Sequence, residues 1–168
     1  MNTRLTLPLL FASFLLAASP TVLHSTGVLS SSSPGQRIDI DIQGIDNLWL
    51  MAEGIPSHLH GHAIWGEAVL IDSDGVATRV CDLKPVTAVV GRGKYTVNRN
   101  PTGKRLRIGS RTLAHGLFAH ADSALHFVLN KRFVRFRALV GIESLAPGDG
   151  NVCFTVATNE VRIAKTDQ

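Results

Sequence analysis

Polar side chains crowd together just ahead of a strand in the second half of the chain. Gly116 is followed by His120, Asp122 and Ser123, and then by alternating residues over 124–129. Such a cluster belongs on a loop at the end of a sheet, where binding sites are usually built. Two uses are open for His120, contact with a sugar or a backbone hydrogen bond at the edge of the core. Asp122 and Ser123 either bind hydroxyl groups or, more commonly, cap the turn.

A second group of histidines has the spacing of a possible metal site. Three histidines alternate within residues 58–62, so in an extended strand they share a face, and neutral imidazoles are common metal ligands. His60, His62 and Glu67 resemble the first motif of cupins, a metal-dependent class of β-barrel enzymes. A cupin also has a second motif with a third histidine, and no histidine closely follows the Pro-Thr-Gly at 101–103. We therefore expect no metal and no other cofactor, with the cupin-like enzyme as the alternative.

Aromatic side chains are candidates for stacking on sugar rings. Trp65 follows a polar loop, and Tyr95 lies in a polar segment between strands. Trp49 has apolar strand neighbours, which favour packing in the core. We select Trp65 and Tyr95, with His120 and Asp122, as the candidate carbohydrate-binding residues.

Nucleophilic catalysis finds no support in the sequence. The chain has no Gly-x-Ser-x-Gly elbow, and neither Cys81 nor Cys153 has a reactive setting. The two cysteines allow at most one internal disulfide, and the sequence leaves open whether they pair or stay as buried thiols. We expect no enzymatic activity.

These residues must be positioned by strands, because no segment beyond the N-terminus has a helical period. Short runs of alternating or apolar residues are separated by Gly, Pro and Asp turns, which predicts an all-β, antiparallel two-sheet sandwich of jelly-roll type. Residues 37–42 and 48–52 are expected to pair as a hairpin. The other expected strands are 63–72, 76–80, 86–90, 106–108, 111–113, 124–129, 133–142, 152–156 and 160–163.

The N-terminus has the pattern of a leader for export. Arg4 precedes an apolar run over 5–18 that is too short for a comfortable membrane span. We assign residues 1–27 to a signal peptide with an approximate end, 28–36 to a flexible Ser-rich linker and 37–168 to the folded domain. We expect an exported protein, whether periplasmic, cell-surface or secreted, without stable membrane insertion.

Composition excludes some partners. The chain has 168 residues, 45% of them hydrophobic, which is enough for the core of one domain. The formal net charge is +4, but the basic residues are scattered and have no interleaved aromatic residues to stack on bases. We expect no binding to nucleic acid and interpret the charge as a solvated surface.

Four elements in the second half of the chain resemble the NPCBM domain. They are the hairpin 108–111, the stretch 116–123 with its His-Ala-Asp-Ser, the strand 136–142, and the Gly-Asn followed by a strand over 150–156. The resemblance implies a galactose-binding-like β-sandwich without catalytic residues, of the kind found beside glycoside hydrolases. Members of that family continue with further strands where this chain ends, and a similar sequence stands at its front, over 47–68. This arrangement favours a circularly permuted domain over a truncated one, because permutation would supply the missing strands.

The sequence thus predicts a non-catalytic, exported carbohydrate-binding module with a glycan or polysaccharide as partner. A sandwich that mediates contacts with other exported proteins is a further alternative.

Overall fold

The structure, a computed structural model, describes residues 20–144 and 148–159. The strands are β1 (Thr21–Ser30), β2 (Gln36–Asp41), β3 (Asn47–Gly54), β4 (His62–Asp72), β5 (Ala77–Arg79), β6 (Thr87–Val90), β7 (Thr96–Val97), β8 (Arg107–Ile108), β9 (Arg111–Thr112), β10 (Gly116–His120), β11 (Ser123–Val128), β12 (Phe133–Ile142) and β13 (Asn151–Thr158). The helical content of these residues is one 3-10 turn, η1 (Val80–Asp82), and no helix in them is long and apolar enough to cross a membrane.

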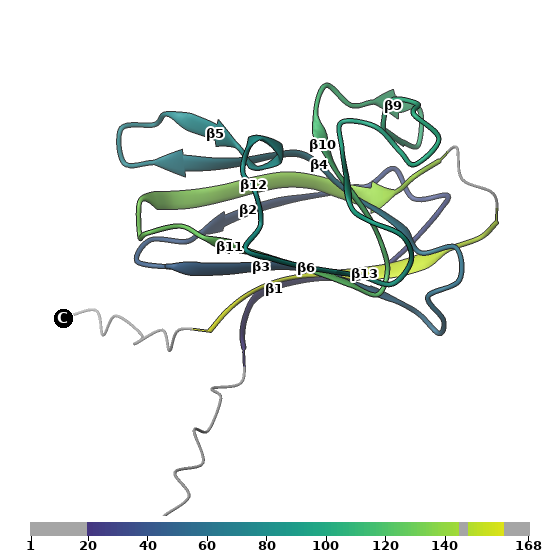
Figure 1. Ribbon diagram of the computed structural model, residues 1–168, viewed down its shortest axis with the longest axis horizontal. Coiled ribbons are helices and arrows are strands. Elements are labelled where there is room, and N and C mark those ends of the chain that lie inside the picture. Colours follow the sequence, from purple (N-terminus) through teal and green to yellow (C-terminus); the bar gives the residue numbers. More distant parts are fainter. Residues whose placement is uncertain (1–19, 145–147, 160–168) are drawn as a thin grey trace, which may run out of the picture.

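The strands form two antiparallel sheets that pack face to face (Figure 1). One has the order β1-β13-β3-β11-β6. The other has the order β2-β12-β4-β10-β7, with β5 added beside β4. The expectation of an all-β, antiparallel two-sheet sandwich is therefore confirmed.

The core between the sheets is built from the inward side chains of both layers. The ring of Trp65 in β4 packs edge to face against the ring of Phe154 in β13, with centroids 5.3 Å apart. Its centroid is 6.4 Å from that of Phe136 in β12. A smaller cluster, made of Ile64, Leu106, Ile108, Leu113, Phe118 and Leu139, lies on the other side of β4. The β8–β9 segment covers that side, so the first part of β4, residues 63–66, is buried on both faces.

The first strand corrects the domain boundaries expected at the N-terminus. The Ser-rich residues were predicted to be a flexible linker, but β1 runs to Ser30 along the edge of β13, and Ser33 N donates to Ser30 O to close a turn. Thr26 is 1% exposed, and its hydroxyl accepts a hydrogen bond from Phe154 N at 3.0 Å. Serine is compatible with this strand because β1 lies at the edge of the sheet, and all of its residues except Thr26 are exposed or only half-buried.

The hairpin predicted for 37–42 and 48–52 is wrong. β2 pairs with β12 in one sheet, whereas β3 lies between β13 and β11 in the other. The residues between them include Ile42 and Ile45, which are 0% and 2% exposed. A connection with two buried isoleucines crosses the core from sheet to sheet, while a hairpin turn would leave such side chains in water.

The front of the chain supplies a central strand to each sheet. β3 has β13 on one side and β11 on the other, and β4 has β12 and β10. The strands that resemble the NPCBM domain therefore pair with strands that precede them in the sequence.

Candidate functional site

The turn between β10 and β11 connects the two sheets and contains Asp122. Asp122 is exposed, and its Oδ1 accepts a hydrogen bond from Gly54 N at 2.9 Å, at the end of β3. Ala121 N donates to Gly61 O at 2.7 Å. Gly91 N donates to His120 O, and a Cβ on Gly91 would lie only 2.5 Å from the carbonyl oxygen of Ala121. Gly54 thus holds the Asp122 carboxylate, while Gly61 and Gly91 hold the backbone of the turn.

Asp122 borders a groove of about 440 Å³ on the outer face of the five-stranded sheet, which we call the Asp122 groove. Outward side chains at alternate positions form its floor, since Ala124 lies opposite both Met51 and Val89, and Thr155 lies opposite Met51. The complete lining is Pro20, Val22, Met51, Ala52, Glu53, Val89, Asp122, Ser123, Ala124, Cys153, Thr155 and Ala157.

The chemistry of this lining is an apolar floor with polar groups beside it. Glu53 and Asp122 offer carboxylate oxygens that accept hydrogen bonds, and Thr155 offers a hydroxyl that both donates and accepts. Such a surface suits a ligand with a weakly apolar face and hydroxyl groups around its rim.

An aromatic stack stands on the same outer face. The rings of Trp49 and His126 are parallel within 4°, with centroids 4.2 Å apart. His126 Nε2 lies 2.9 Å from Asn47 Oδ1, which fixes the imidazole ring. Trp49 is half-buried and points away from the core, in contrast to the packing that its apolar neighbours favoured. It lies two positions before Met51 of the groove floor.

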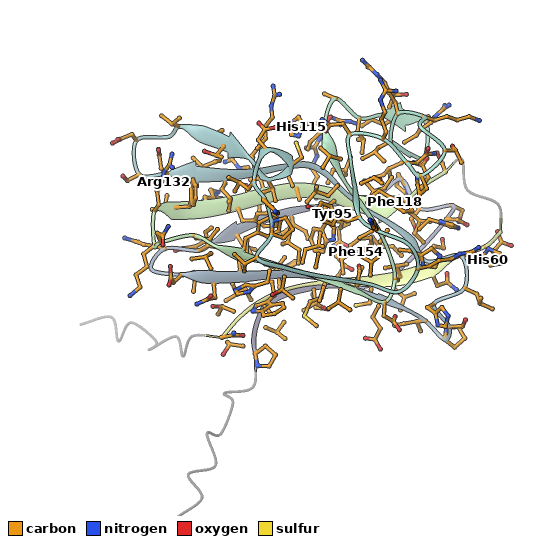
Figure 2. All side chains as sticks on the ribbon, viewed as in Figure 1. His60, Tyr95, His115, Phe118, Arg132 and Phe154 are labelled. Atoms are coloured by element: carbon orange, nitrogen blue, oxygen red, sulfur yellow. The ribbon has the colours of Figure 1, made fainter. Side chains whose placement is uncertain are left out.

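His60, which is labelled in Figure 2, lies at the loop end of the sandwich just before the start of β4, and two other histidines lie close to it. The ring of His62 is 4.9 Å from that of His120 and 6.4 Å from that of His60. His120 is 7% exposed, and its Nδ1 lies 2.7 Å from Ala121 O, so Nδ1 carries the proton because a carbonyl oxygen only accepts. Burial lowers the pKa of His62, and nearby His120, His60 and Arg92 lower it further.

The ligand set of the cupin-like alternative does not assemble. His60 and His62 lie with His120, whereas Glu67 accepts a hydrogen bond from Arg111 at 2.5 Å. Within residues 20–144 and 148–159, no three His, Cys, Asp or Glu side chains come together in an arrangement that could hold a metal ion.

Three of the four predicted sugar-contacting residues, Trp65, Tyr95 and His120, do not line the Asp122 groove. Trp65 is 0% exposed and lies in the core, so it has no surface to offer a glycan. Tyr95 is half-buried against the core cluster and does not line the Asp122 groove. Asp122 lines the groove, whereas His120 is buried at the end of β10, in the other sheet. The cysteines are both free, Cys81 in the core and Cys153 in the groove lining, and burial raises the pKa of the Cys81 thiol.

Sequence reasoning did not find the groove floor. Met51, Val89, Cys153 and Thr155 come from three different strands, and each is an ordinary outward residue of its own strand. The order of strands in the sheet brings them together, and no local pattern carries that order.

Comparison with known proteins identifies the family from the second half of the chain. The NPCBM/NEW2 domain matches residues 77–168, which include β5 to β13. No curated protein and no solved structure matches the chain. NPCBM domains are carbohydrate-binding modules and are generally non-catalytic. The matched segment is more than half of the chain, and the protein belongs to the NPCBM/NEW2 domain family.

Proposed function

We propose that this protein is a non-catalytic, exported carbohydrate-binding module that holds a glycan in the Asp122 groove. The observation that carries the proposal is the lining of that groove, in which an apolar floor lies beside two exposed carboxylates. Sugar rings have weakly apolar faces surrounded by hydroxyl groups, and both parts find partners there. Membership of a carbohydrate-binding family supports the same assignment.

Export is supported by the N-terminal sequence. Arg4 precedes the apolar run 5–18, which has the length of a signal-peptide core. A protein exported to the periplasm, the cell surface or the medium can encounter polysaccharides and the glycans of other cells.

The Asp122→Asn variant provides the sharpest test of the groove. Asparagine keeps an oxygen that accepts the hydrogen bond of Gly54 N, while it removes the charge that faces the ligand. A glycan that binds the wild-type protein is first identified on a glycan array, and its Kd is then measured by calorimetry. We expect Asp122→Asn to weaken binding by about 1–3 kcal/mol, since a hydrogen bond to a charged group is lost.

A second variant blocks the groove by shape alone. Ala124→Phe places a ring on the floor between Met51 and Val89, and we expect it to abolish binding while the circular dichroism spectrum is unchanged. Asp74→Asn is the matched control for Asp122→Asn, because Asp74 is an exposed acid of the β4–β5 turn outside the groove. If Asp122→Asn and Ala124→Phe both keep full affinity, the glycan binds elsewhere. A folded protein that binds no glycan on the array contradicts the proposed function itself.

A further inference from the structure

A second hollow, of about 360 Å³, lies on the outer face of the six-stranded sheet, across the sandwich from the Asp122 groove. Its lining is Arg37, Ile38, Asp39, Glu67, Val69, Arg137, Ala138 and Leu139. We call it the Arg37 hollow. It combines apolar side chains with charges of both signs, unlike the Asp122 groove, whose charged groups are acids.

A β-bulge shapes this hollow. Arg137 of β12 lies opposite Val69, whereas Leu139 lies opposite Gly66, so the pairing with β4 slips between these positions. Glu67 has a φ of 49° at the slip. The extra residue bends the strand and re-aims its neighbours, as bulges do. The apolar floor is half-buried Val69 together with the small part of Leu139, 6% of its surface, that is exposed, and charged side chains lie around it.

The carboxylates of the hollow are already matched by arginines. Asp39 accepts hydrogen bonds from Arg135 Nε at 2.5 Å and from Arg137 Nε at 3.2 Å, and the bond from Arg135 is the main cause that lowers the pKa of Asp39. Glu67 accepts from Arg111 at 2.5 Å. These partners leave neither acid of the hollow as an uncompensated negative charge.

Within the described part of the chain, one positively charged side chain of the hollow has no acidic partner. Arg37 is exposed, lies opposite Leu139 on the neighbouring strand, and has no ion-pair or hydrogen-bond partner for its side chain among the described residues. The lining itself carries two positive charges, Arg37 and Arg137, and two negative ones, Asp39 and Glu67, and the salt bridges from Arg111 and Arg135 add two positive charges beside it. Asp41 lies opposite Arg135 and does not line the hollow. With Arg111, Arg135 and Asp41 included as neighbours, the count is four positive charges against three negative ones, and Arg37 and Arg137 lie on adjacent strands at the wall of the hollow.

We propose that the Arg37 hollow is a second binding site and recognises the oxyanion of an acidic sugar, a uronate carboxylate or a sulfate ester. Guanidinium groups bind such oxyanions with two parallel hydrogen bonds, and Arg137 uses only its Nε for Asp39. The sugar ring then lies over Leu139 and Val69. The formal charge of +4 favours the approach of a polyanion to the whole molecule.

Nucleic acid is the competing polyanion, and the lining argues against it. No aromatic side chain lines the hollow, so bases have nothing on which to stack. A sugar carrying one oxyanion needs only the cationic wall and the apolar floor.

The experiment titrates the full chain, at low ionic strength, with oligogalacturonate, with a sulfated dextran oligosaccharide and with neutral dextran. We expect binding to at least one acidic probe and none to the neutral one, and the probe that binds identifies the oxyanion. Arg37→Gln should weaken that binding about tenfold or more, because a charge-assisted hydrogen bond is lost, and Arg37→Lys should weaken it less.

Arg92→Gln is the matched control, since Arg92 is an exposed arginine at the loop end outside the hollow. Equal losses in Arg37→Gln and Arg92→Gln would reduce the effect to general attraction of polyanions and overturn the proposal. So would tighter binding of duplex DNA that competes with the acidic sugar, or the absence of binding to both acidic probes. Asp122→Asn should leave the affinity for the acidic probe unchanged, so the two proposed sites stand or fall separately.

Discussion

At the scale of single residues, burial decides how the histidines of this chain respond to pH. Desolvation lowers the pKa of His62, His115 and His126, each of which lies partly inside the protein. A lowered pKa means that the folded state prefers the neutral ring, while the unfolded chain takes up a proton near the ordinary value of about 6.5. The folded state therefore loses stability relative to the unfolded state as the pH falls through that value.

We predict that the midpoint temperature of thermal unfolding decreases as the pH is lowered from about 7.5 to about 5. The His62→Gln variant should show a smaller decrease over the same range. Between the two pKa values of His62 the unfolded chain binds more protons, so stability rises with pH in that window. Glutamine cannot be protonated and removes this contribution. Melting curves at half-unit pH steps measure it, with His58→Gln, an exposed histidine of the same loop, as the control. A variant whose curve of midpoint against pH parallels the wild type would show that His62 has no part in it.

Trp65 illustrates why it is hard to predict which side chains of a strand are exposed when both sides of the strand are covered. Alternation would have separated inward from outward side chains, but Ile64 and Trp65 are both fully buried. Ile64 packs beneath the β8–β9 segment, and Trp65 packs in the core. The sequence carries no sign that a remote hairpin covers β4, so the tryptophan after a polar loop was assigned to the surface. Asp122 was found because its turn is short and its residue types are local.

At the scale of elements, β1 shows the same limit. Its serines and threonines have the composition of a linker, and only the bonds to β13 make them a strand. The strands over 123–128 and 133–142 could be predicted, since alternation of apolar and polar residues over 123–128 and in the first half of 133–142 is a property of each strand alone. The pairing of β2 with β12 could not be predicted from the residues of β2 alone, because it depends on how the other strands are arranged around the core.

We predict that the mature protein begins before Thr21. A leader removed near Gly27, the approximate end expected from the sequence, divides β1 and takes away the Thr26 hydroxyl that accepts the hydrogen bond of Phe154 N. A chain starting at Pro20 should unfold cooperatively in urea. A chain starting at Val28 should aggregate, because the edge of β13 is uncovered and Phe154 N, inside the protein, loses its acceptor. N-terminal sequencing of exported protein gives the natural start, and equal urea midpoints for the two chains would contradict the structural role of β1.

At the scale of the whole molecule, the segment that matches the family model lacks a central strand of each sheet. Residues 77–168 contain β5 to β13, but both sheets then lack a central strand, β3 in one and β4 in the other. Trp65 is lost with β4, and the inward faces of β10, β11, β12 and β13 lose the side chains that cover them.

We predict that a 77–168 fragment is unfolded or aggregated, and that co-expression with residues 20–76 restores a soluble complex. Far-ultraviolet circular dichroism and size-exclusion chromatography measure the two outcomes. The 20–76 fragment with β4 interrupted by Leu70→Pro, at a fully buried position that pairs with Phe136, is the control that should fail to complement. A 77–168 fragment that is monomeric and melts cooperatively would show that the front strands are an addition to a complete domain.

The pairing of Thr21 with Thr158 sets the order in which this chain can fold during synthesis. β13 is the last described strand to leave the ribosome, and it lies between β1 and β3, two of the first. At the usual rates of translation the early strands wait on the order of 10 s for that partner. Folding then requires closure of a loop almost as long as the chain, which belongs to the slow class of topologies dominated by non-local contacts. The unpaired edge of β3 is open throughout this wait, so the hazard of aggregation falls on the nascent chain, before β13 covers that edge.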